Sequence, residues 1–285
     1  MNWEETIIAI RKREDLQALV HQSYIHEDLE LNVRNFAVSE EFKATLNLLK
    51  HYAPEATSIL DVGSGNGITA INFALKGYQV TAVEPDESDT VGAGAINILK
   101  AKYKLDNIEV HQSLAEEIKF EDNTFDVVYI RQAMHHAKDL NAFIKECVRV
   151  LKPKGLLLSI RDHVIFNHQD KTWFLDSHPL HQFYGGENAF TPRAYKTAIE
   201  LAGATVVKEL KYYDSIINYF PLSEADCQAK KAMEIEQQQQ RLKNKIGILY
   251  KLPFVWYFYT LISGFTPLDE KKIPGRMYSY IALKT

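Results

Sequence analysis

Three glycines on alternate positions, Gly63, Gly65 and Gly67, interrupt an otherwise apolar run. The residues before them are typical of a strand, and residues 68–76 after them have helical character. A glycine turn lets bare backbone approach a ligand, and the start of a helix offers unpaired N–H groups and a positive dipole end. Glu84 ends the next apolar run, about twenty residues on, where a carboxylate can accept hydrogen bonds from both hydroxyls of a ribose. These residues predict a binding site for a nucleotide-type ligand.

A second set of residues could orient an acceptor or move a proton, as histidine and carboxylate side chains do near neutral pH. They follow the apolar runs that end near residues 130 and 160, and they are His135, His136, Arg161, Asp162, His163, His178, His181, Tyr184 and Glu187. We rank His136 above His135 as the residue that faces the nucleotide pocket, although either could instead cap or pack a helix. At least one of residues 161–163, which include His163, is predicted to contact the substrate. Alternatively, these residues form a local ion pair.

His178 and His181 could also ligate a metal ion. No clear third ligand accompanies them, so we predict no metal site. The polar and aromatic segment around them, residues 178–187, is better explained as a loop that closes over an acceptor. Gly185 and Gly186 would then serve as its hinge.

Alternating strand and helix patterns must position both sets of residues. Strands are expected at residues 59–62, 79–83, 108–111, 125–130 and 156–160, and helices between them at 68–75, 91–103 and 140–151. This alternation predicts an α/β protein with a parallel sheet and helices on both faces. Ligands of such sheets bind beyond the carboxyl ends of the strands, and the glycine turn, Glu84 and the histidines all follow strand ends.

The remaining segments suggest three parts of the chain. Residues 1–53 are predicted to be helical, with Ser39 as the N-cap of a helix, and residues 54–212 with 276–285 to form the cofactor-binding domain. The apolar residues of segment 24–37 follow no clear periodicity. The segment either packs outside the sheet or folds over a ligand. Residues 161–190 are expected to be irregular. Residues 213–275 are predicted to be an inserted helical lid.

An aromatic stretch at residues 254–265 lies within this insertion. It is shorter than the ~20 residues that a membrane-spanning helix needs. It could pack on its own domain or roof the active site. It could also contact a membrane surface or a lipid substrate, since Lys243, Lys245 and Lys251 lie just upstream.

Composition excludes some classes of function. A formal net charge of −4 disfavours nucleic acid as a partner, because no basic excess is available to neutralise phosphates. The two cysteines, Cys147 and Cys227, offer neither a disulfide framework nor a zinc spacing. The amino terminus lacks the basic and then apolar order of a signal peptide. We expect a cytoplasmic protein, with peripheral contact to the inner membrane face as the alternative.

Five motifs decide which nucleotide is bound. Residues 59–160 resemble the class I S-adenosylmethionine-dependent methyltransferases, most closely the branch that includes the ubiquinone/menaquinone-biosynthesis enzymes. The matching segments are LDVGSGNG at 60–67, VEPD at 83–86, AEEIKF at 115–120, DNTFDVV at 122–128 and VLKPKG at 150–155. The resemblance implies a Rossmann-like sheet of seven strands, mostly parallel, with the last strand antiparallel; residues 205–212 and 277–284 could supply the final pair.

The resemblance also implies roles for individual residues. Gly63, Ser64 and Gly65 would pass under the methionine and ribose parts of S-adenosylmethionine, and Asp61 would orient this loop and the amino group. Glu84 would hold the ribose hydroxyls. Pro85 and Asp86 would lie beside the adenine, and the backbone of Arg131 would lie near the methionine amino end.

One position departs from the family pattern. Relatives commonly carry an aspartate before the Ala-Glu pair, which receives the adenine amino group, whereas this chain has Leu114. The adenine could instead be held by the backbone of Ala115, by Glu116 or by Ser113.

The sequence therefore predicts an S-adenosylmethionine-dependent methyltransferase that acts on an oxygen or nitrogen of a small molecule, with lipid-linked and glycosidic acceptors both open. A general base is not obligatory, because the sulfonium cofactor carries its own leaving group. An NAD-dependent oxidoreductase is one alternative, disfavoured because Gly67 stands one place earlier than the third glycine of a dinucleotide fingerprint. A catalytically inactive, cofactor-binding regulatory subunit is the other.

Overall fold

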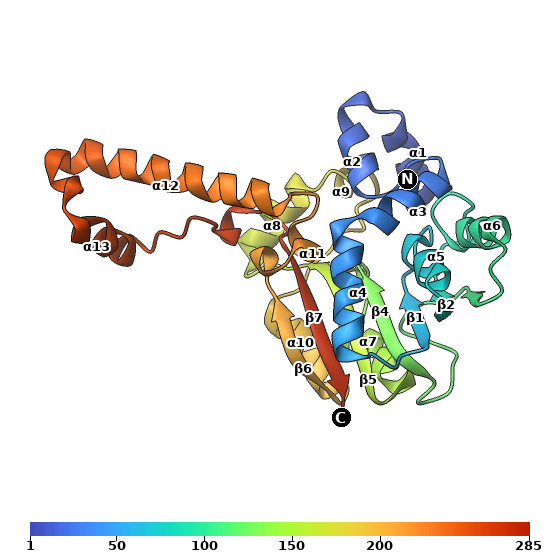
Figure 1. Cartoon of the computed structure of the whole chain (residues 1–285). Helices are drawn as coiled ribbons and strands as arrows, with labels where there is room; N and C mark the ends of the chain where they lie inside the picture. Colours follow the sequence, from blue (N-terminus) through green and yellow to red (C-terminus); the bar gives the residue numbers. More distant parts are fainter.

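A sheet of seven strands in the order β3-β2-β1-β4-β5-β7-β6 forms the centre of the molecule (Figure 1). The computed structural model describes residues 1–285, apart from the side chains of residues 250 and 253. The strands are β1 (Ser58–Val62), β2 (Gln79–Val83), β3 (Ile108–His111), β4 (Phe125–Arg131), β5 (Leu151–His163), β6 (Ala204–Leu210) and β7 (Met277–Lys284). The first five are parallel, and β7 runs antiparallel to both β5 and β6. The predicted fold class is thereby confirmed.

Successive side chains of a strand point to opposite faces of the sheet, so both faces carry apolar side chains, and helices bury each of them. Leu60 and Val128 point into one buried cluster, with helices α7 (Leu140–Val150) and α10 (Pro192–Leu201). Ile59 and Val127 point into the other cluster. That second layer comprises α3 (Leu29–Val38), α4 (Glu40–Tyr52), α5 (Ile68–Leu75) and α6 (Ala93–Tyr103).

The N-terminal helices lie at the end of the sheet where the parallel strands terminate (Figure 1). Helices α1 (Trp3–Arg11) and α2 (Gln17–Gln22) share a small apolar cluster with Val91 and Leu180. Trp3 also packs edge-on against Tyr184 of α9 (His181–Tyr184), with ring centroids 5.1 Å apart. The segment 24–37, left open by the sequence, packs mainly outside the sheet, since most of its buried residues join the cluster around α5.

Residues 161–190 are more regular than the sequence predicts. Strand β5 continues to His163 across a register shift against β7, between Ser159 and Asp162, and Arg161 there takes a left-handed backbone conformation (φ 62°). Helix α8 (His168–Ser177) begins behind an Asn167 side chain that accepts a hydrogen bond from the N–H of Asp170. The polar composition of this segment suggested an irregular loop. Many of its polar side chains are instead paired inside the protein.

The segment predicted to be an inserted helical lid is folded into helices, and its outer half lies away from the body (Figure 1). After η3 (Tyr212–Asp214) and α11 (Ile216–Tyr219), the chain forms α12 (Glu224–Ile246), η4 (Gly247–Lys251) and α13 (Pro253–Ser263), before η5 (Glu270–Lys272). Residues 224–263, which we call the arm, project away from the body (Figure 1). Helix α12 is polar around most of its circumference, with Cys227 and Leu242 as its buried residues, so it has no broad apolar face to pack on the body.

Each helix that the structure describes is too short or too polar to cross a bilayer.

Candidate active site

The glycine turn between β1 and α5 has the conformation that only glycine adopts without strain. The φ angles of Gly63, Gly65 and Gly67 are 70°, 55° and 83°. A Cβ atom on Gly63 would lie 2.5 Å from the Cβ of Ala133, and one on Gly67 would lie 2.9 Å from Cγ1 of Ile96. The turn therefore needs glycine both for its backbone angles and for the close approach of its neighbours.

Glu84 connects this turn to the end of β2. Its Oε2 accepts a hydrogen bond from the N–H of Gly65 at 2.7 Å, and its Oε1 accepts one from the N–H of Asp86 at 3.0 Å. Burial raises the pKa of Glu84 to about 7, against the lowering effect of these two N–H groups. A carboxylate has lone pairs beyond the two used here, so Glu84 can still accept hydrogen bonds from a ligand.

A cavity of about 510 Å³, the nucleotide cavity, opens beside Glu84. It is lined by most of the residues that the resemblance places around the cofactor: Gly63, Gly65, Glu84, Pro85, Asp86, Ser113, Leu114, Ala115 and Glu116. Ser64 and Arg131, also predicted to bind the cofactor, line only the second cavity described below. Ala137 and Phe143 add apolar wall, which suits the faces of an adenine ring. Leu114 is 45% exposed at the rim, while an oxygen of Glu116 accepts a hydrogen bond from the N–H of Lys138 at 3.0 Å.

A second cavity of about 200 Å³, the histidine cavity, lies on the other side of the glycine turn. Its polar lining includes Ser64, Asn66, Thr69, Arg131, His135, His163, His178 and Glu187. The two cavities share Trp3, Gly63, Gly65, Gln132 and His136. The glycine turn and His136 therefore border both spaces, as the boundary between a donor and an acceptor would.

His135 is buried between two carboxylates. Its Nδ1 lies 3.0 Å from Oδ1 of Asp162, and its Nε2 lies 3.6 Å from Oε2 of Glu187. Burial lowers the pKa of His135, but the two carboxylates outweigh burial and raise the pKa to about 9. Asp162 also accepts hydrogen bonds from the N–H of His135 and from the hydroxyl of Ser159, at 3.1 and 2.6 Å. Asp162 thus orients His135 without lining either cavity itself.

The pKa values of the neighbouring histidines are lowered. Desolvation in the cavity and the charge of His135 lower the pKa of His136 to about 4; its Nδ1 lies 3.3 Å from the carbonyl oxygen of Gly186. Burial and the same charge lower the pKa of His163, whose Nδ1 lies 2.5 Å from the carbonyl oxygen of Gly275.

Glu187 links these histidines from the other side of the cavity. Its carboxylate accepts a hydrogen bond from the hydroxyl of Tyr184 at 2.9 Å and lies 3.9 Å from Nδ1 of His178. Burial opposes ionisation, but His135 holds the pKa of Glu187 well below its usual range. Residues 178–187 thus help to build the cavity wall.

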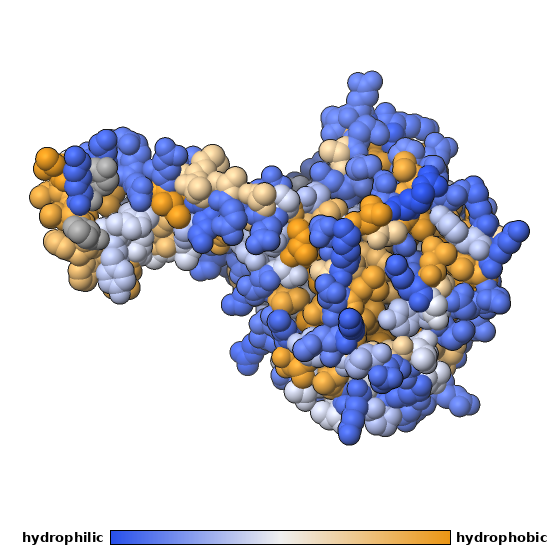
Figure 2. Space-filling model, in the orientation of Figure 1, coloured by the Kyte–Doolittle hydropathy of each residue, from blue (hydrophilic) through white to orange (hydrophobic). Residues whose placement is uncertain are grey.

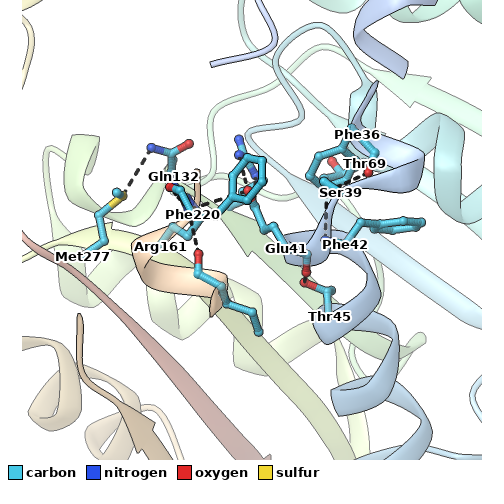
Figure 3. A network of polar contacts seen from close by, with 12 residues as sticks. Phe36, Ser39, Glu41, Phe42, Thr45, Thr69, Gln132, Arg161, Phe220 and Met277 are labelled. Carbon is cyan, nitrogen blue, oxygen red and sulfur yellow. Dashed lines mark hydrogen bonds and ion pairs between the residues drawn. The ribbon is translucent and has the colours of Figure 1, made fainter. Parts of the chain in front are cut away.

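The Arg131 side chain is held by an ion pair that the sequence did not predict. Its Nε and Nη2 donate to the two carboxylate oxygens of the fully buried Glu41, at 2.6 and 3.0 Å. Arg161 approaches the same carboxylate at 3.7 Å and donates from Nη1 to the carbonyl oxygens of Ile217 and Phe220 (Figure 3). Arg161 therefore supports α11 and Glu41, and it lines neither cavity.

Asp61 also acts one step away from the ligand space. Its Oδ2 accepts a hydrogen bond from the hydroxyl of Thr69 at 2.5 Å, and its carbonyl oxygen accepts one from Ser64. Burial raises the pKa of Asp61 to about 6. Among the predicted cofactor-binding residues, Asp61 is the one outside both cavities; the carboxylate braces the turn, as its predicted loop-orienting role requires.

Several lining residues were not predicted. Asn66, Thr69 and Gln132 directly follow or precede residues that the motifs identified, so their position beside the turn and the end of β4 could have indicated them. Trp3, Leu19, Ile25 and Leu180 also line the histidine cavity. Leu180 lies within the predicted loop 178–187, whereas nothing in the sequence marks the other three, because their place depends on how the N-terminal segment packs on α9.

The strand order, the glycine turn and the acidic end of β2 together define the Rossmann-like fold of class I methyltransferases. Residues 60–159 match the methyltransferase domain family. The chain is 32% identical over 105 residues to an uncharacterized methyltransferase of Bacillus subtilis, covering 37% of this chain and 40% of that protein. It is 32% identical over 102 residues to the ubiquinone biosynthesis O-methyltransferase of Rickettsia bellii, covering 35% and 40%.

The fold is also similar to that of phosphoethanolamine N-methyltransferase 2 of Haemonchus contortus, solved in complex with S-adenosyl-L-methionine. The TM-score is 0.56 at 19% identity, with 100% of this chain and 60% of that chain covered. Residues 60–159 are thus similar to methyltransferase domains, and the fold is that of solved S-adenosylmethionine-binding methyltransferases. It spans about 40% of the length of the two curated relatives described above.

Proposed function

We propose that this chain transfers the methyl group of S-adenosylmethionine to an oxygen or nitrogen atom of a small molecule held in the histidine cavity. The observation that carries this proposal is the shared border of the two cavities. Gly63, Gly65 and His136 line both, so a donor on one side and an acceptor on the other would meet across them. In-line transfer requires this juxtaposition.

The residues of the nucleotide cavity fit the cofactor. The glycine turn leaves its backbone bare, and Glu84 faces the cavity with a carboxylate suited to ribose hydroxyls. When bound, S-adenosylmethionine supplies a methyl group on a sulfonium that already carries its leaving group. The protein is left to bind, orient and desolvate the acceptor.

The histidine cavity supports a small polar acceptor group. At about 200 Å³, with histidine, carboxylate and amide side chains in its wall, it suits a hydroxyl- or amine-bearing group better than an extended apolar one. His136 is the side chain that we place against the acceptor atom, because it borders both cavities. His135 and His163 would orient the acceptor from deeper in the cavity.

Two measurements test the donor half and the reaction. Calorimetry should detect binding of S-adenosylhomocysteine and none of NADH; the reverse result would favour a dinucleotide oxidoreductase. The chain should then transfer label from methyl-labelled S-adenosylmethionine to a molecule in the small-molecule fraction of a cell extract. Cofactor binding with no labelled product from any fraction would favour the inactive regulatory subunit.

The arm supports a lipid-linked acceptor. Its far end carries apolar side chains that are each more than half exposed, namely Ile248, Leu249, Phe254, Tyr257, Phe258, Leu261 and Ile262. Figure 2 shows hydrophobic residues gathered at this end of the arm, next to hydrophilic ones. Monomeric proteins rarely expose such clusters without a partner. We propose that this tip enters the headgroup region of an anionic membrane, because Lys245 and Lys251 flank it.

Flotation with phosphatidylglycerol-containing vesicles tests this contact. Wild-type protein should float with the vesicles, and a Phe258→Ser/Leu261→Ser/Ile262→Ser variant should stay at the bottom. Leu201→Ser is the matched control, because Leu201 is 75% exposed on the body and its loss should leave flotation unchanged. Light scattering that shows a dimer through the tip, with no flotation, would assign the arm to a second copy of the chain instead.

A further inference from the structure

Three buried side chains from distant parts of the sequence converge on one point of the histidine cavity. His135, His163 and Glu187 each present one potential ligand atom, and these atoms lie within 4.8 Å of one another. Two of them, Nε2 of His135 and Oε2 of Glu187, are 3.6 Å apart. Nitrogen and oxygen ligands of a tetrahedral zinc ion, with bonds of about 2.0–2.2 Å, lie roughly this far apart.

The two histidines are oriented as metal-binding histidines usually are. Nδ1 of His135 pairs with Asp162 at 3.0 Å, and Nδ1 of His163 pairs with the carbonyl oxygen of Gly275 at 2.5 Å. Both interactions suit a proton on Nδ1, so Nε2 is the nitrogen that would face a cation. For His135, which is charged in the ligand-free protein, a cation would replace the Nε2 proton that faces Glu187. Ligating histidines commonly donate their other N–H to a carboxylate or a backbone carbonyl in this way.

His178 offers a fourth ligand. Its Nδ1 is buried and lacks a hydrogen-bond partner among the described residues. This nitrogen lies 3.9 Å from Oε1 of Glu187, and the ring lies 5.4 Å from that of His163. Nδ1 of His181 is likewise buried without a hydrogen-bond partner among the described residues, so the contacts of His178 with Glu187 and His163 are what single it out.

We propose that His135, His163 and Glu187 bind a divalent transition-metal ion, with His178 as a fourth ligand. Three imidazoles and one carboxylate suit zinc, cobalt(II) or iron(II), whereas magnesium and calcium prefer oxygen ligands. The ion would stand in the wall of the cavity in which we place the acceptor. Ion binding itself does not depend on methyl transfer, so each claim can fail alone.

The ligands come from η2 (Met134–His136), the end of β5, and the segment after α8. The sequence showed only the pair His178 and His181, and no third ligand. Packing of η2 against the end of β5 supplies the missing ligands. Neither His178 nor His181 belongs to the three-ligand cluster, but His178 contacts Glu187 and His163, so His181 is a matched control for His178.

Cobalt(II) titration of the chelator-treated chain tests the site, followed by visible absorption and by calorimetry, with zinc as a competitor. We expect one ion per chain, with ligand-field bands that zinc removes. Glu187→Gln and His178→Asn should weaken cobalt binding by about tenfold or more, as loss of a ligand does. His181→Asn should bind cobalt like the wild type.

Binding of S-adenosylhomocysteine by each variant shows that it is folded, because the nucleotide cavity holds none of the proposed ligands. Failure to bind one cobalt ion, or equal loss in His181→Asn and His178→Asn, would overturn the metal site. A chain that binds cobalt and transfers no methyl group would overturn the proposed function and leave the site standing.

Discussion

The two cavities that meet at the glycine turn differ in whether backbone or side chains form their walls. The nucleotide cavity is formed by backbone turns and short motifs at the ends of β1 and β2, and it contains one deeply placed carboxylate, Glu84. The histidine cavity has its charged and polar side chains on segments far apart in the sequence, among them the glycine turn, the end of β4, η2, the end of β5 and residues 178–187; Arg131 in its wall is held by Glu41 of α4. A backbone-built site depends on local conformation, whereas a side-chain-built site depends on buried charges remaining paired.

The largest effect is expected where the pairing of the histidine cavity is removed. Glu41→Gln would leave Arg131 and Arg161 facing each other without a carboxylate, at positions that are almost fully buried. Breaking a buried pair costs about 4 kcal/mol, so the free energy of unfolding should fall by that order. Urea denaturation measures the change. Lys43→Gln, which removes an exposed ion pair on the same helix, should change stability by less than about 1 kcal/mol.

A loss below 1 kcal/mol for Glu41→Gln would show that the two arginines find other partners or water. The histidine cavity would then be less dependent on paired charge than its structure indicates.

The next effect concerns the backbone of the nucleotide cavity. Gly63→Ala places a methyl group 2.5 Å from Cβ of Ala133 at a φ of 70°, so strain and crowding should together lower stability by about 3 kcal/mol. Gly77→Ala is the control, because its φ of 92° is also left-handed but its added Cβ would meet nothing within 4 Å. Its cost should be about 1 kcal/mol. Equal losses in urea unfolding would mean that crowding at the turn is unimportant.

The same contrast explains what the sequence could predict. The glycine turn, Glu84 and residues 113–116 line the nucleotide cavity as expected, because each follows its strand directly and strand ends share one edge of a parallel sheet. Glu41 looked like an ordinary acidic residue in the first turn of a helix. Its partner Arg131 is 90 residues away in the sequence. Such a pairing depends on how α4 packs on the sheet, which local patterns do not specify.

The arm shows a second limit of local patterns. Residues 224–246 are strongly helix-forming, and the helix is present. The direction in which α12 leaves the body depends on tertiary contacts near its start, so neither its period nor its length could distinguish a lid from a projecting arm.

A smaller effect is expected on binding when Glu84 loses its charge. Glu84→Gln keeps the size of the side chain but replaces charge-assisted hydrogen bonds to ribose with neutral ones. Binding of S-adenosylhomocysteine should weaken by about 1.5 kcal/mol, measured by calorimetry at pH 8. Asp86→Asn, at a neighbouring position of the same cavity, should weaken binding less, because we assign it no ribose contact. Unchanged affinity in Glu84→Gln would remove Glu84 from the ribose site.

The smallest effect is a pH dependence of cofactor binding that arises from the same carboxylate. Burial raises the pKa of Glu84 to about 7 in the ligand-free protein. Only the ionised carboxylate accepts hydrogen bonds from both ribose hydroxyls, so a ligand that prefers this form must displace a proton at pH values below that pKa. Affinity for S-adenosylhomocysteine should therefore be constant above pH 7.5 and should fall between pH 7 and 6, by no more than about tenfold at pH 6. Because glutamine does not titrate, Glu84→Gln should bind with the same reduced affinity at both ends of this range. If the affinity of the wild type is the same from pH 8 to pH 6, the N–H groups of Gly65 and Asp86 keep Glu84 ionised despite its burial. The backbone of the nucleotide cavity would then determine the ionisation of its buried carboxylate.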